Sequence, residues 1–293
     1  MENGRLYHGF RRGIYMFPCD EEEKDRMDIY HKILEVARRG QLHQAPIYVN
    51  PQDPPRILDL GCGTGIWAID MADKYQTAEV VGLDLVNIQP EKIPPNLRFR
   101  VPRDYESNVW SLGEDSWDLI HVQMACGSVS SWPELYQKIF QHLKPGIGWI
   151  EHVEVDLQPR CDDGTLSRNS ELVKWYDYVA DATNRVNRPL AYRHDTRQML
   201  QTAGFIDIRE DVIRAPLNGW PSDPHQKQIG RWYSLGLTDN LEALSLAPLT
   251  RVYRWNATDH VRPLIKQVKK EIAQSKIHAY NNIHIWTARR PVQ

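Results

Sequence analysis

The segment that most constrains the fold of this chain is residues 57 to 65, which read Ile-Leu-Asp-Leu-Gly-Cys-Gly-Thr-Gly. An apolar run of strand type leads through Asp59 into a turn with glycine at every second position, Gly61, Gly63 and Gly65. Glycine tolerates a positive φ, a tight turn or the close approach of a ligand to the backbone. A helix that begins after this turn directs its unpaired N–H groups toward whatever lies over the glycines. The segment therefore predicts a strand, a ligand-binding turn and a helix.

A second acid lies where a nucleoside site requires one. The apolar run at residues 80 to 83 ends in Asp84, which is 25 positions after Asp59 (84 minus 59). In nucleoside-binding βαβ units, a carboxylate at the end of the second strand binds the ribose hydroxyls. Glycine-rich turns also occur as plain connections, but a strand, an acid, three glycines, a helix and a second strand ending in Asp together favour a cofactor site.

The spacing of the glycines narrows the choice of cofactor. Dinucleotide-binding turns follow the pattern GxGxxG, whereas this turn follows GxGxG and is preceded by Asp59. A carboxylate repels a pyrophosphate but attracts the ammonium and sulfonium groups of S-adenosylmethionine. The sequence therefore favours S-adenosylmethionine over a nicotinamide or flavin dinucleotide.

The predicted cofactor contacts cluster at the ends of strands. We expect Asp59 to hold the methionyl ammonium, directly or through water, and Asp84 to bind the ribose. Because ligands of doubly wound sheets lie at the carboxyl ends of the strands, Asp59, Asp84, Asp104 and Gln123 are expected to converge on one crevice. Asp104 is predicted to accept from the adenine amine, with Tyr105 against the ring. The alternative for Asp104 is a turn or helix-capping role, which is common for Asp.

Other candidate residues carry weaker signals. Cys62 and Leu85 are expected to contribute to the same cofactor site, since they adjoin Gly61 and Asp84. The small size of Cys62 is enough to explain it inside the turn, and no adjacent base marks it as a nucleophile.

The methyl acceptor is harder to place. Tyr7, His8 and Tyr15 belong to an aromatic and basic stretch that is expected either to close over a ligand or to pack on the core. Trp132, His152 and also Glu154 are candidates for an acceptor pocket; the alternative is that they are hydrogen-bonded structural groups. No catalytic residue is assigned, because positioning alone supplies much of the catalysis of an in-line methyl transfer.

Composition excludes several classes of function. The net charge is −2, from 36 Lys plus Arg and 38 Asp plus Glu, so no global basic field predicts binding to nucleic acid or anionic lipid. No apolar run approaches the roughly 20 residues that span a bilayer. The four cysteines show neither a CxxC pair nor the spacing of a metal site. The first residues lack the layout of a secretory signal, so we expect an intracellular protein without a bound metal.

The order of predicted elements is that of an α/β, Rossmann-like fold with a doubly wound, mostly parallel sheet. Strands are predicted at 56–60, 79–84, 97–101, 117–122 and 148–155, with helices at 66–74 and 132–143. An N-terminal helix of about 18 residues is predicted after the acids at 20–23, on helical spacing. Later elements are helices at 170–185 and 193–203, a strand at 206–215, a helical insertion at 220–275 and a final strand at 278–289.

We divide the chain into three parts. Residues 1–50 are expected to form an N-terminal lid and helix, and residues 51–160 the cofactor-binding core. Residues 161–293 are expected to complete the sheet and to add a helical layer that contacts substrate or partner.

The segment 59–69 resembles the class I methyltransferases, and the rest of the chain resembles more narrowly the fungal LaeA-like methyltransferases. The narrower resemblance lies in stretches spread over nearly the whole chain, at 3–8, 13–18, 117–121, 127–133, 159–164, 245–248 and 251–255. One turn departs from the family pattern: Lys144 to Trp149 reads Lys-Pro-Gly-Ile-Gly-Trp, where the family has Pro-Gly-Gly-Trp. From this departure we expect an altered entry or register of the fifth strand.

The resemblance implies a class I methyltransferase that uses S-adenosylmethionine and acts as a nuclear regulator of fungal secondary metabolism and development, together with velvet-domain proteins. It does not name the methyl acceptor. Two alternatives stay open. One is a small-molecule methyltransferase of a biosynthetic pathway, which a deep, closed apolar pocket under residues 7–17 would favour. The other is a regulatory scaffold that binds the cofactor without useful catalysis.

Overall fold

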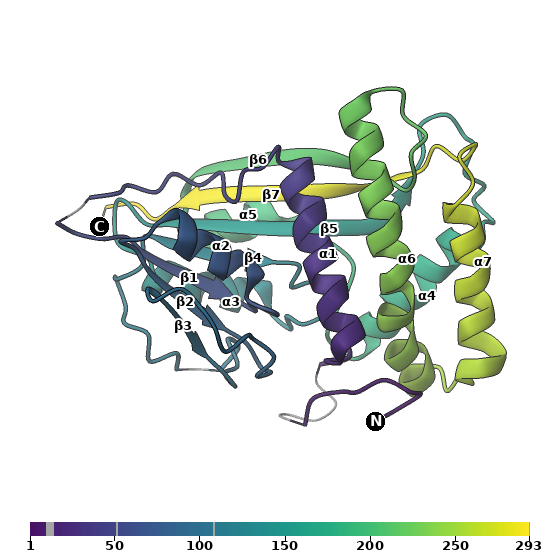
Figure 1. Cartoon of the computed structure of the whole chain (residues 1–293), viewed down its shortest axis with the longest axis horizontal. Coiled ribbons are helices and arrows are strands. Elements are labelled where there is room, and N and C mark those ends of the chain that lie inside the picture. Colours follow the sequence, from purple (N-terminus) through teal and green to yellow (C-terminus); the bar gives the residue numbers. More distant parts are fainter. Residues whose placement is uncertain (10–14, 51, 108, 293) are drawn as a thin grey trace.

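A seven-stranded β-sheet organises the residues that the computed structural model describes, which are 1–9, 15–50, 52–107 and 109–292 (Figure 1). The strands lie in the order β3-β2-β1-β4-β5-β7-β6. Their bounds are Arg56–Leu60 for β1, Glu79–Leu83 for β2, Leu97–Arg100 for β3, Leu119–Gln123 for β4, Trp149–Arg160 for β5, Ile206–Pro216 for β6 and Tyr280–Arg289 for β7.

The first five strands pair in parallel, and of the last two only β7 runs in the opposite direction. β1 pairs with β2 and β4, and β3 and β5 extend this parallel group on either side. β7 runs antiparallel between β5 and β6. Parallel strands need crossover connections, so their carboxyl ends all meet at one edge of the sheet. The predicted doubly wound, mostly parallel sheet is confirmed, and Asp59, Asp84 and Gln123 lie toward its carboxyl edge.

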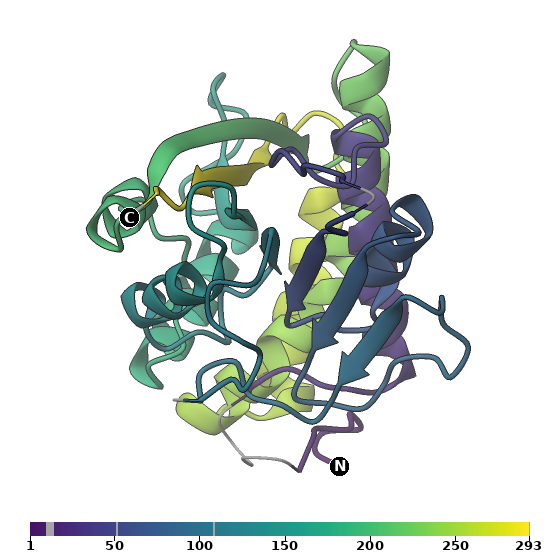
Figure 2. The same cartoon turned by 90° about the vertical axis from the view of Figure 1, so that its left-hand side faces the viewer.

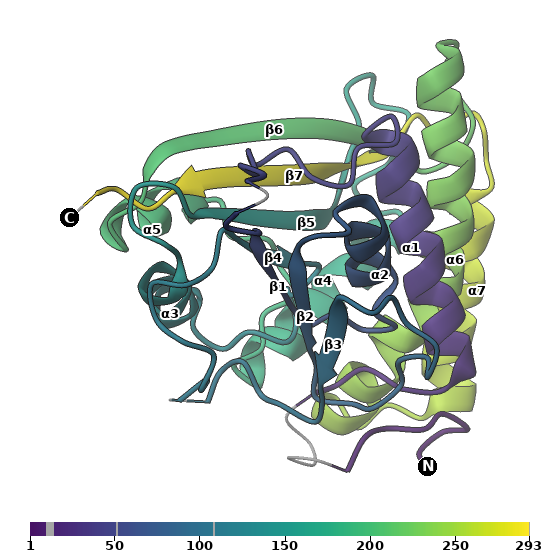
Figure 3. The ribbon, with the colours of Figure 1, turned by 60° about the vertical axis from the view of Figure 1, so that its left-hand side comes forward.

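Helices cover both faces and one end of this sheet. They are α1 Glu21–Ala37, α2 Ile66–Lys74, α3 Trp132–His142, α4 Glu171–Arg185, α5 Thr196–Thr202, α6 Pro224–Val252, the π-helical turn η1 Ala257–Val261 and α7 Arg262–Ile272. In Figure 3, α1, α6 and α7 stand side by side at one end of the sheet, with α3 and α5 on its other side. No helix in the described part of the chain is long and apolar enough to cross a membrane.

Alternation along the central strands explains the two covered faces. Successive side chains of a strand point to opposite faces. Ile57 of β1 packs in the cluster that contains Met71 of α2, whereas its neighbour Leu58 packs in the cluster that contains Ile139 of α3 and Leu200 of α5. The near-continuous apolar runs of these strands therefore reflect burial on both faces, as is typical of parallel sheets.

The N-terminal residues are attached to the helical layer through α1. Asp20 caps α1 by accepting from the Glu23 N–H at 3.1 Å, and the acids of the first turn suit the positive end of the helix dipole. The same carboxylate binds both Nε and Nη2 of Arg5, at 2.8 and 2.6 Å. Arg251 at the end of α6 binds Glu2, so the N-terminus lies beside that end of α6 (Figure 2).

The later part of the chain follows the prediction with shifted boundaries. The predicted helical insertion is confirmed as α6, η1 and α7. The fifth strand extends five residues beyond the predicted end at 155, to Arg160, because β7 pairs with it as far as Arg160 through an irregularity after Asp156. Such tertiary pairing has no local sequence signal.

The departing turn at 144–149 leaves the register of β5 intact. Trp149 pairs with Leu119 of β4, and the pairing continues without a shift to Gln123 and Val153. The extra residue is absorbed by the turn: Gly146 has a φ of 80°, and Ile147 is 50% exposed.

Replacing Gly148 with alanine is expected to lower the free energy of unfolding by about 1–3 kcal/mol, the usual cost of overpacking. A Cβ at this position would lie 2.7 Å from the Lys144 backbone nitrogen and 2.8 Å from its carbonyl oxygen, where no side-chain motion relieves the overlap. Chemical denaturation measures the change. Ile147→Ala in the same turn is the control, with a change within about 0.5 kcal/mol; equal stability of the two variants would contradict the prediction.

Candidate functional site

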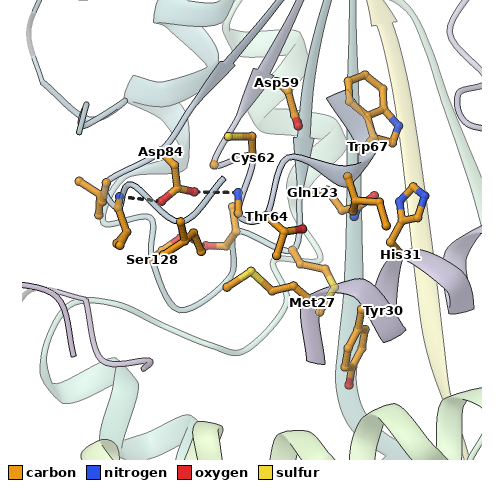
Figure 4. Close-up of a pocket in the computed structure, with 18 of the residues that line it drawn as sticks. Met27, Tyr30, His31, Asp59, Cys62, Thr64, Trp67, Asp84, Gln123 and Ser128 are labelled. Carbon is orange, nitrogen blue, oxygen red and sulfur yellow. Dashed lines mark hydrogen bonds between the residues drawn. The ribbon is translucent and has the colours of Figure 1, made fainter. Parts of the chain in front are cut away.

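A cavity opens at the carboxyl edge of the sheet, over the glycine turn (Figure 4). It encloses about 1020 Å³, including its mouth. Its walls come from the glycine turn, from the residues after β2 and β4, from α1 and from the segment around Tyr15. The structure thus brings together Asp59, Asp84 and Gln123, as predicted from their positions on three strands.

The glycine turn is held against β2 by its own backbone. The N–H groups of Gly61 and Cys62 both donate to the Leu83 carbonyl, at 2.8 and 2.9 Å. Gly61 and Gly63 have φ values of 74° and 56°, in the left-handed region that favours glycine. A Cβ on Gly63 would lie 2.7 Å from the sulfur of Met27. The Met27 side chain of α1 therefore occupies the space that a Cβ on residue 63 would need.

Gly65 serves a different purpose from the one predicted. It does not line the cavity. It precedes α2 with a φ of 81°, and a Cβ would lie 2.3 Å from Cζ of Phe99 on β3. The third glycine therefore allows the start of α2 to pack against β3 rather than lending a surface to the cavity.

Asp84 is fixed by two backbone donors. Its Oδ2 accepts from the Gly63 N–H at 2.8 Å, and its Oδ1 accepts from the Val86 N–H at 3.0 Å (Figure 4). A carboxylate oxygen has two acceptor sites, so each oxygen keeps capacity for a ligand hydroxyl. Burial, assisted by the charge of Asp59, raises the pKa of Asp84 from 3.8 to about 6 despite these hydrogen bonds.

Asp59 is paired with a histidine that the sequence analysis missed. Oδ1 of Asp59 lies 2.9 Å from Nδ1 of His121, and His121 stacks on Trp67 with ring centroids 3.7 Å apart. Asp59 and His121 face each other in register on β1 and β4, and all three residues line the cavity. The available signal was that His121 is a polar residue in register with Asp59 on the neighbouring strand, which can be recognised only once the strand order is known.

Asp104 and Tyr105 lie at the adjoining end of the site. Asp104 accepts from the Glu106 N–H at 2.7 Å, which is the turn role named as its alternative, and it lines a small cavity next to the main one, together with His8. Tyr105 lines both cavities, and its hydroxyl lies 2.7 Å from that of Ser128. Burial raises the pKa of the Tyr105 hydroxyl, so it stays protonated and acts as a hydrogen-bonding group.

Cys62, Leu85 and Gln123 line the main cavity as predicted from their neighbours. Burial raises the pKa of the Cys62 thiol well above its ordinary value. The thiolate is the nucleophilic form of cysteine, so the structure gives no support to Cys62 as a nucleophile.

The predicted lid residues separate. Tyr15 is half-buried and lines both cavities, with its ring 5.4 Å from that of His8. Tyr7 instead packs under the Arg251 guanidinium, which lies 4.8 Å from its ring centroid. The central residues of this stretch, 10–14, lie outside the described part of the chain.

Trp132 and His152 do not line the main cavity. Both are buried: the His152 ring lies 4.4 Å from Trp132, and its two nitrogens lie 2.8 Å from the Tyr136 hydroxyl and 3.1 Å from Glu154. Glu154 in turn accepts from the Ala125 and Cys126 N–H groups. These contacts match the structural alternative that was named for Trp132 and His152.

Helix α1 supplies a wall that the sequence analysis did not predict. Met27, Tyr30 and His31 project from it into the main cavity (Figure 4). Met124, directly after β4, has a φ of 52° and also lines the main cavity. Two methionine thioethers, Met27 and Met124, therefore face a cavity that also contains carboxylates and aromatic rings.

Comparison with known proteins supports one reading of this geometry. Residues 30–210 match the model of a methyltransferase domain family. The chain is 74% identical over 293 residues to the secondary metabolism regulator LAE1 of Cochliobolus heterostrophus, covering 100% of this chain and 95% of that protein. It is 50% identical over 293 residues to a protein of Emericella nidulans named protein-methionine methyltransferase laeA, covering 100% of this chain and 76% of that protein.

Solved structures with the same fold bind the predicted cofactor. The chain superposes on phosphoethanolamine N-methyltransferase 2 of Haemonchus contortus in complex with S-adenosyl-L-methionine, with a TM-score of 0.51 and 17% identity, over 89% of this chain and 53% of that one. The S-adenosylhomocysteine complex of that enzyme gives a TM-score of 0.50 at the same coverage. This chain spans about half the length of that enzyme, and the likeness concerns the fold.

Proposed function

This chain belongs to the LaeA family of secondary metabolism regulators with an S-adenosylmethionine-dependent methyltransferase domain, and from that premise we propose that it methylates the thioether of a methionine in a protein. The observation that carries the proposal is the main cavity, which combines a cofactor site with two methionine side chains, Met27 and Met124. The name of the Emericella nidulans relative supports the same acceptor chemistry.

The residues of the main cavity fit S-adenosylmethionine. Asp84 has acceptor capacity for the ribose hydroxyls, and the backbone at Gly61 and Gly63 forms a cradle that a Cβ on Gly63 would fill. Asp59, at the carboxyl end of β1, would bind the methionyl ammonium. The ring of Tyr105 lies beside Gly61. When bound, the cofactor supplies an electrophilic methyl group on a sulfonium.

A thioether acceptor requires no general base, and no base is assigned at this site. A lone pair of the methionine sulfur forms the new S–CH₃ bond while the methyl–sulfonium bond of the cofactor breaks, giving a methylated sulfonium and S-adenosylhomocysteine. No proton is released, so no residue has to accept one. The two histidines of the main cavity are paired with carboxylates: His31 with Asp70 at 2.8 Å and His121 with Asp59.

The product of such a transfer is a cation, and the main cavity is suited to one. The rings of Tyr15, Tyr30 and Trp67 line it, and aromatic faces attract sulfonium and ammonium groups. The carboxylates of Asp59 and Asp84 add negative charge. These groups stabilise a developing sulfonium by position and charge alone.

The test is transfer of a labelled methyl group by the purified full chain, followed by peptide mass spectrometry. We expect the label on methionine, either in this chain or in a protein of the extract. Met27→Leu and Met124→Leu separate modification of the cavity wall from modification of another protein. Label on lysine, arginine or histidine, or no label while the cofactor binds, would contradict the proposal; the second result would instead favour a regulatory scaffold.

The proposal extends to partners, location and organisation. We infer, from the LaeA-like resemblance, that the chain assembles with velvet-domain proteins and acts in the nucleus. Residues 1–50 would serve as the lid and first helix, 51–160 as the cofactor-binding core and 161–293 as the substrate or partner layer. Co-purification of tagged full-length chain with a purified velvet-domain protein, and fluorescence imaging of the tagged chain in hyphae, test the first two statements.

The affinity for S-adenosylmethionine is expected to rise with pH and to level off above about pH 7. The pKa of Asp84 is raised to about 6 by burial, so the free protein takes up a proton as the pH falls through this value. Ribose hydroxyls donate to the ionised form, so binding must expel that proton, and affinity at about pH 5 should be roughly tenfold weaker. Calorimetric titration at several pH values measures the affinity. If the affinity of Asp84→Asn depended on pH as steeply as that of wild type, another group would be responsible for the pH dependence.

A further inference from the structure

A second cavity lies on the far side of Met124 from the cofactor site. The apolar walls of this side cavity include Phe17, Leu157, Leu190 and Leu244, and its polar lining residues include Arg26, Glu154 and Asn240. Tyr15, Arg26 and Met124 line both the side cavity and the main cavity. The side cavity therefore adjoins the main cavity through these three shared residues.

Two hydrogen-bonding groups of opposite kind lack partners here. Asn240 of α6 is 2% exposed; its Nδ2 donates to the Tyr30 hydroxyl at 3.2 Å, and its Oδ1 is buried without a hydrogen-bond partner among the described residues. Arg26 of α1 pairs with Glu23 through Nη2 at 2.6 Å, and its Nε is buried and equally unpartnered in that part of the chain. Buried polar groups are normally satisfied, so each such group calls for an explanation.

A main-chain amide carries one group that is complementary to each of these atoms. Its N–H is a donor for Asn240 Oδ1, and its carbonyl is an acceptor for Arg26 Nε–H. The other charged group of the side cavity, Glu154, is already held by the Ala125 and Cys126 N–H groups and by His152. The remaining walls suit an unbranched apolar side chain.

We propose that the side cavity is the acceptor subsite, and that it binds a methionine residue through its side chain and its main-chain amide. Arg26 and Asn240 hold the amide, and the apolar walls hold the side chain next to Met124 and the cofactor site. The assignment rests on the proposed function, because it names the acceptor position of the same reaction. It makes Asn240, which does not itself line the main cavity, a determinant of specificity.

Binding of a minimal probe tests the assignment without requiring catalysis. N-acetyl-L-methioninamide is titrated into the full chain in the presence of S-adenosylhomocysteine, in wild type and in Leu244→Trp and Asn240→Leu. We expect Leu244→Trp, which fills the side cavity, to weaken the probe at least tenfold, and Asn240→Leu, which is close in size, to weaken it about fivefold, the effect of one lost hydrogen bond. S-adenosylhomocysteine affinity should stay within about twofold, because neither residue lines the main cavity.

Leu235→Trp is the matched control, since Leu235 lies on the same helix and is 46% exposed. N-acetyl-L-norleucinamide should bind like the probe, and ethyl methyl sulfide, which has no amide, should bind more weakly. The proposal is overturned if wild type does not bind the probe, if both cavity variants bind it like wild type, or if the sulfide binds as well as the amide. Failure of the proposed function is a separate result: the probe would bind as expected while no methyl group reaches methionine.

Discussion

Gly63→Asp is expected to weaken S-adenosylmethionine binding at least a hundredfold while the chain stays folded. Three effects act together at this residue. Its φ of 56° is one that a residue with a Cβ adopts at a cost of about 1–2 kcal/mol. The Cβ would lie 2.7 Å from the Met27 sulfur, so the Met27 side chain would have to move. The new carboxylate would also adjoin Asp84, to which the Gly63 N–H donates, and would compete for the space of the cofactor.

These effects are expected to lower the affinity for the cofactor rather than the stability of the core. The Met27 sulfur lies near the end of a flexible side chain. The overlap can therefore be relieved by movement of that side chain into the main cavity. A hundredfold loss corresponds to about 2.7 kcal/mol, which strain and like-charge repulsion supply without unfolding. The substitution is therefore expected to reduce the affinity for S-adenosylmethionine while the chain stays folded.

Calorimetric titration with S-adenosylmethionine measures the loss, and circular dichroism checks the fold. Gly164→Asp is a matched control, because Gly164 also has a positive φ, 76°, but a Cβ there meets nothing within 4 Å. It should bind the cofactor like wild type. Retained affinity in Gly63→Asp would mean that the turn is a structural connection and that the cofactor lies elsewhere.

The cofactor half of the site could be predicted from sequence because its signals are local. A strand, an acid and a glycine turn are contiguous, and Asp84 follows at a fixed interval. Local patterns also misled: Gly65 belongs to the same motif, yet it packs against Phe99. Asp104 uses a side-chain oxygen in its own turn, a role that short-range chemistry offers to any Asp.

The helical wall of the main cavity could not be predicted, because it depends on which helix crosses the carboxyl edge of the sheet. The periodicity of α1 indicates that one of its faces is buried, but not what covers that face. In the structure that face contributes Met27 and Tyr30 to the main cavity, and α6, more than 200 positions later in the chain, brings Asn240 against Tyr30. The orientation of His152 could not be predicted for the same reason: a side chain on a buried strand can point to either face of the sheet, and here it contacts Tyr136.

The position of α1 depends in turn on a buried ion pair. Arg38, at the end of α1, places Nη2 2.6 Å from Oε1 of Glu151 on β5, and the two side chains are 2% and 0% exposed. The second oxygen of Glu151 accepts from the N–H groups of Gln44 and Ala45, at 2.6 and 2.8 Å. One carboxylate thus ties the end of α1 and the segment after it to the centre of the sheet. Burial alone would raise the pKa of Glu151, but the charge of Arg38 keeps it below its ordinary value of 4.5.

Arg38→Met is therefore expected to lower the free energy of unfolding by about 3–5 kcal/mol at neutral pH, because it leaves a buried carboxylate without its counter-charge. Lys32→Met is the matched control on the same helix: Lys32 pairs with Glu35, but the two side chains are 44% and 37% exposed, and such pairs contribute about 0.5 kcal/mol or less. Chemical denaturation at several pH values measures both. Since the pKa of Glu151 is lowered in the folded protein, the contribution of the pair is present above about pH 4.5 and is lost as the pH falls through the folded value. The deficit of Arg38→Met should shrink in acid accordingly. A deficit no larger than that of Lys32→Met would mean that the hydrogen bonds from Gln44 and Ala45 hold α1 in place without the ion pair.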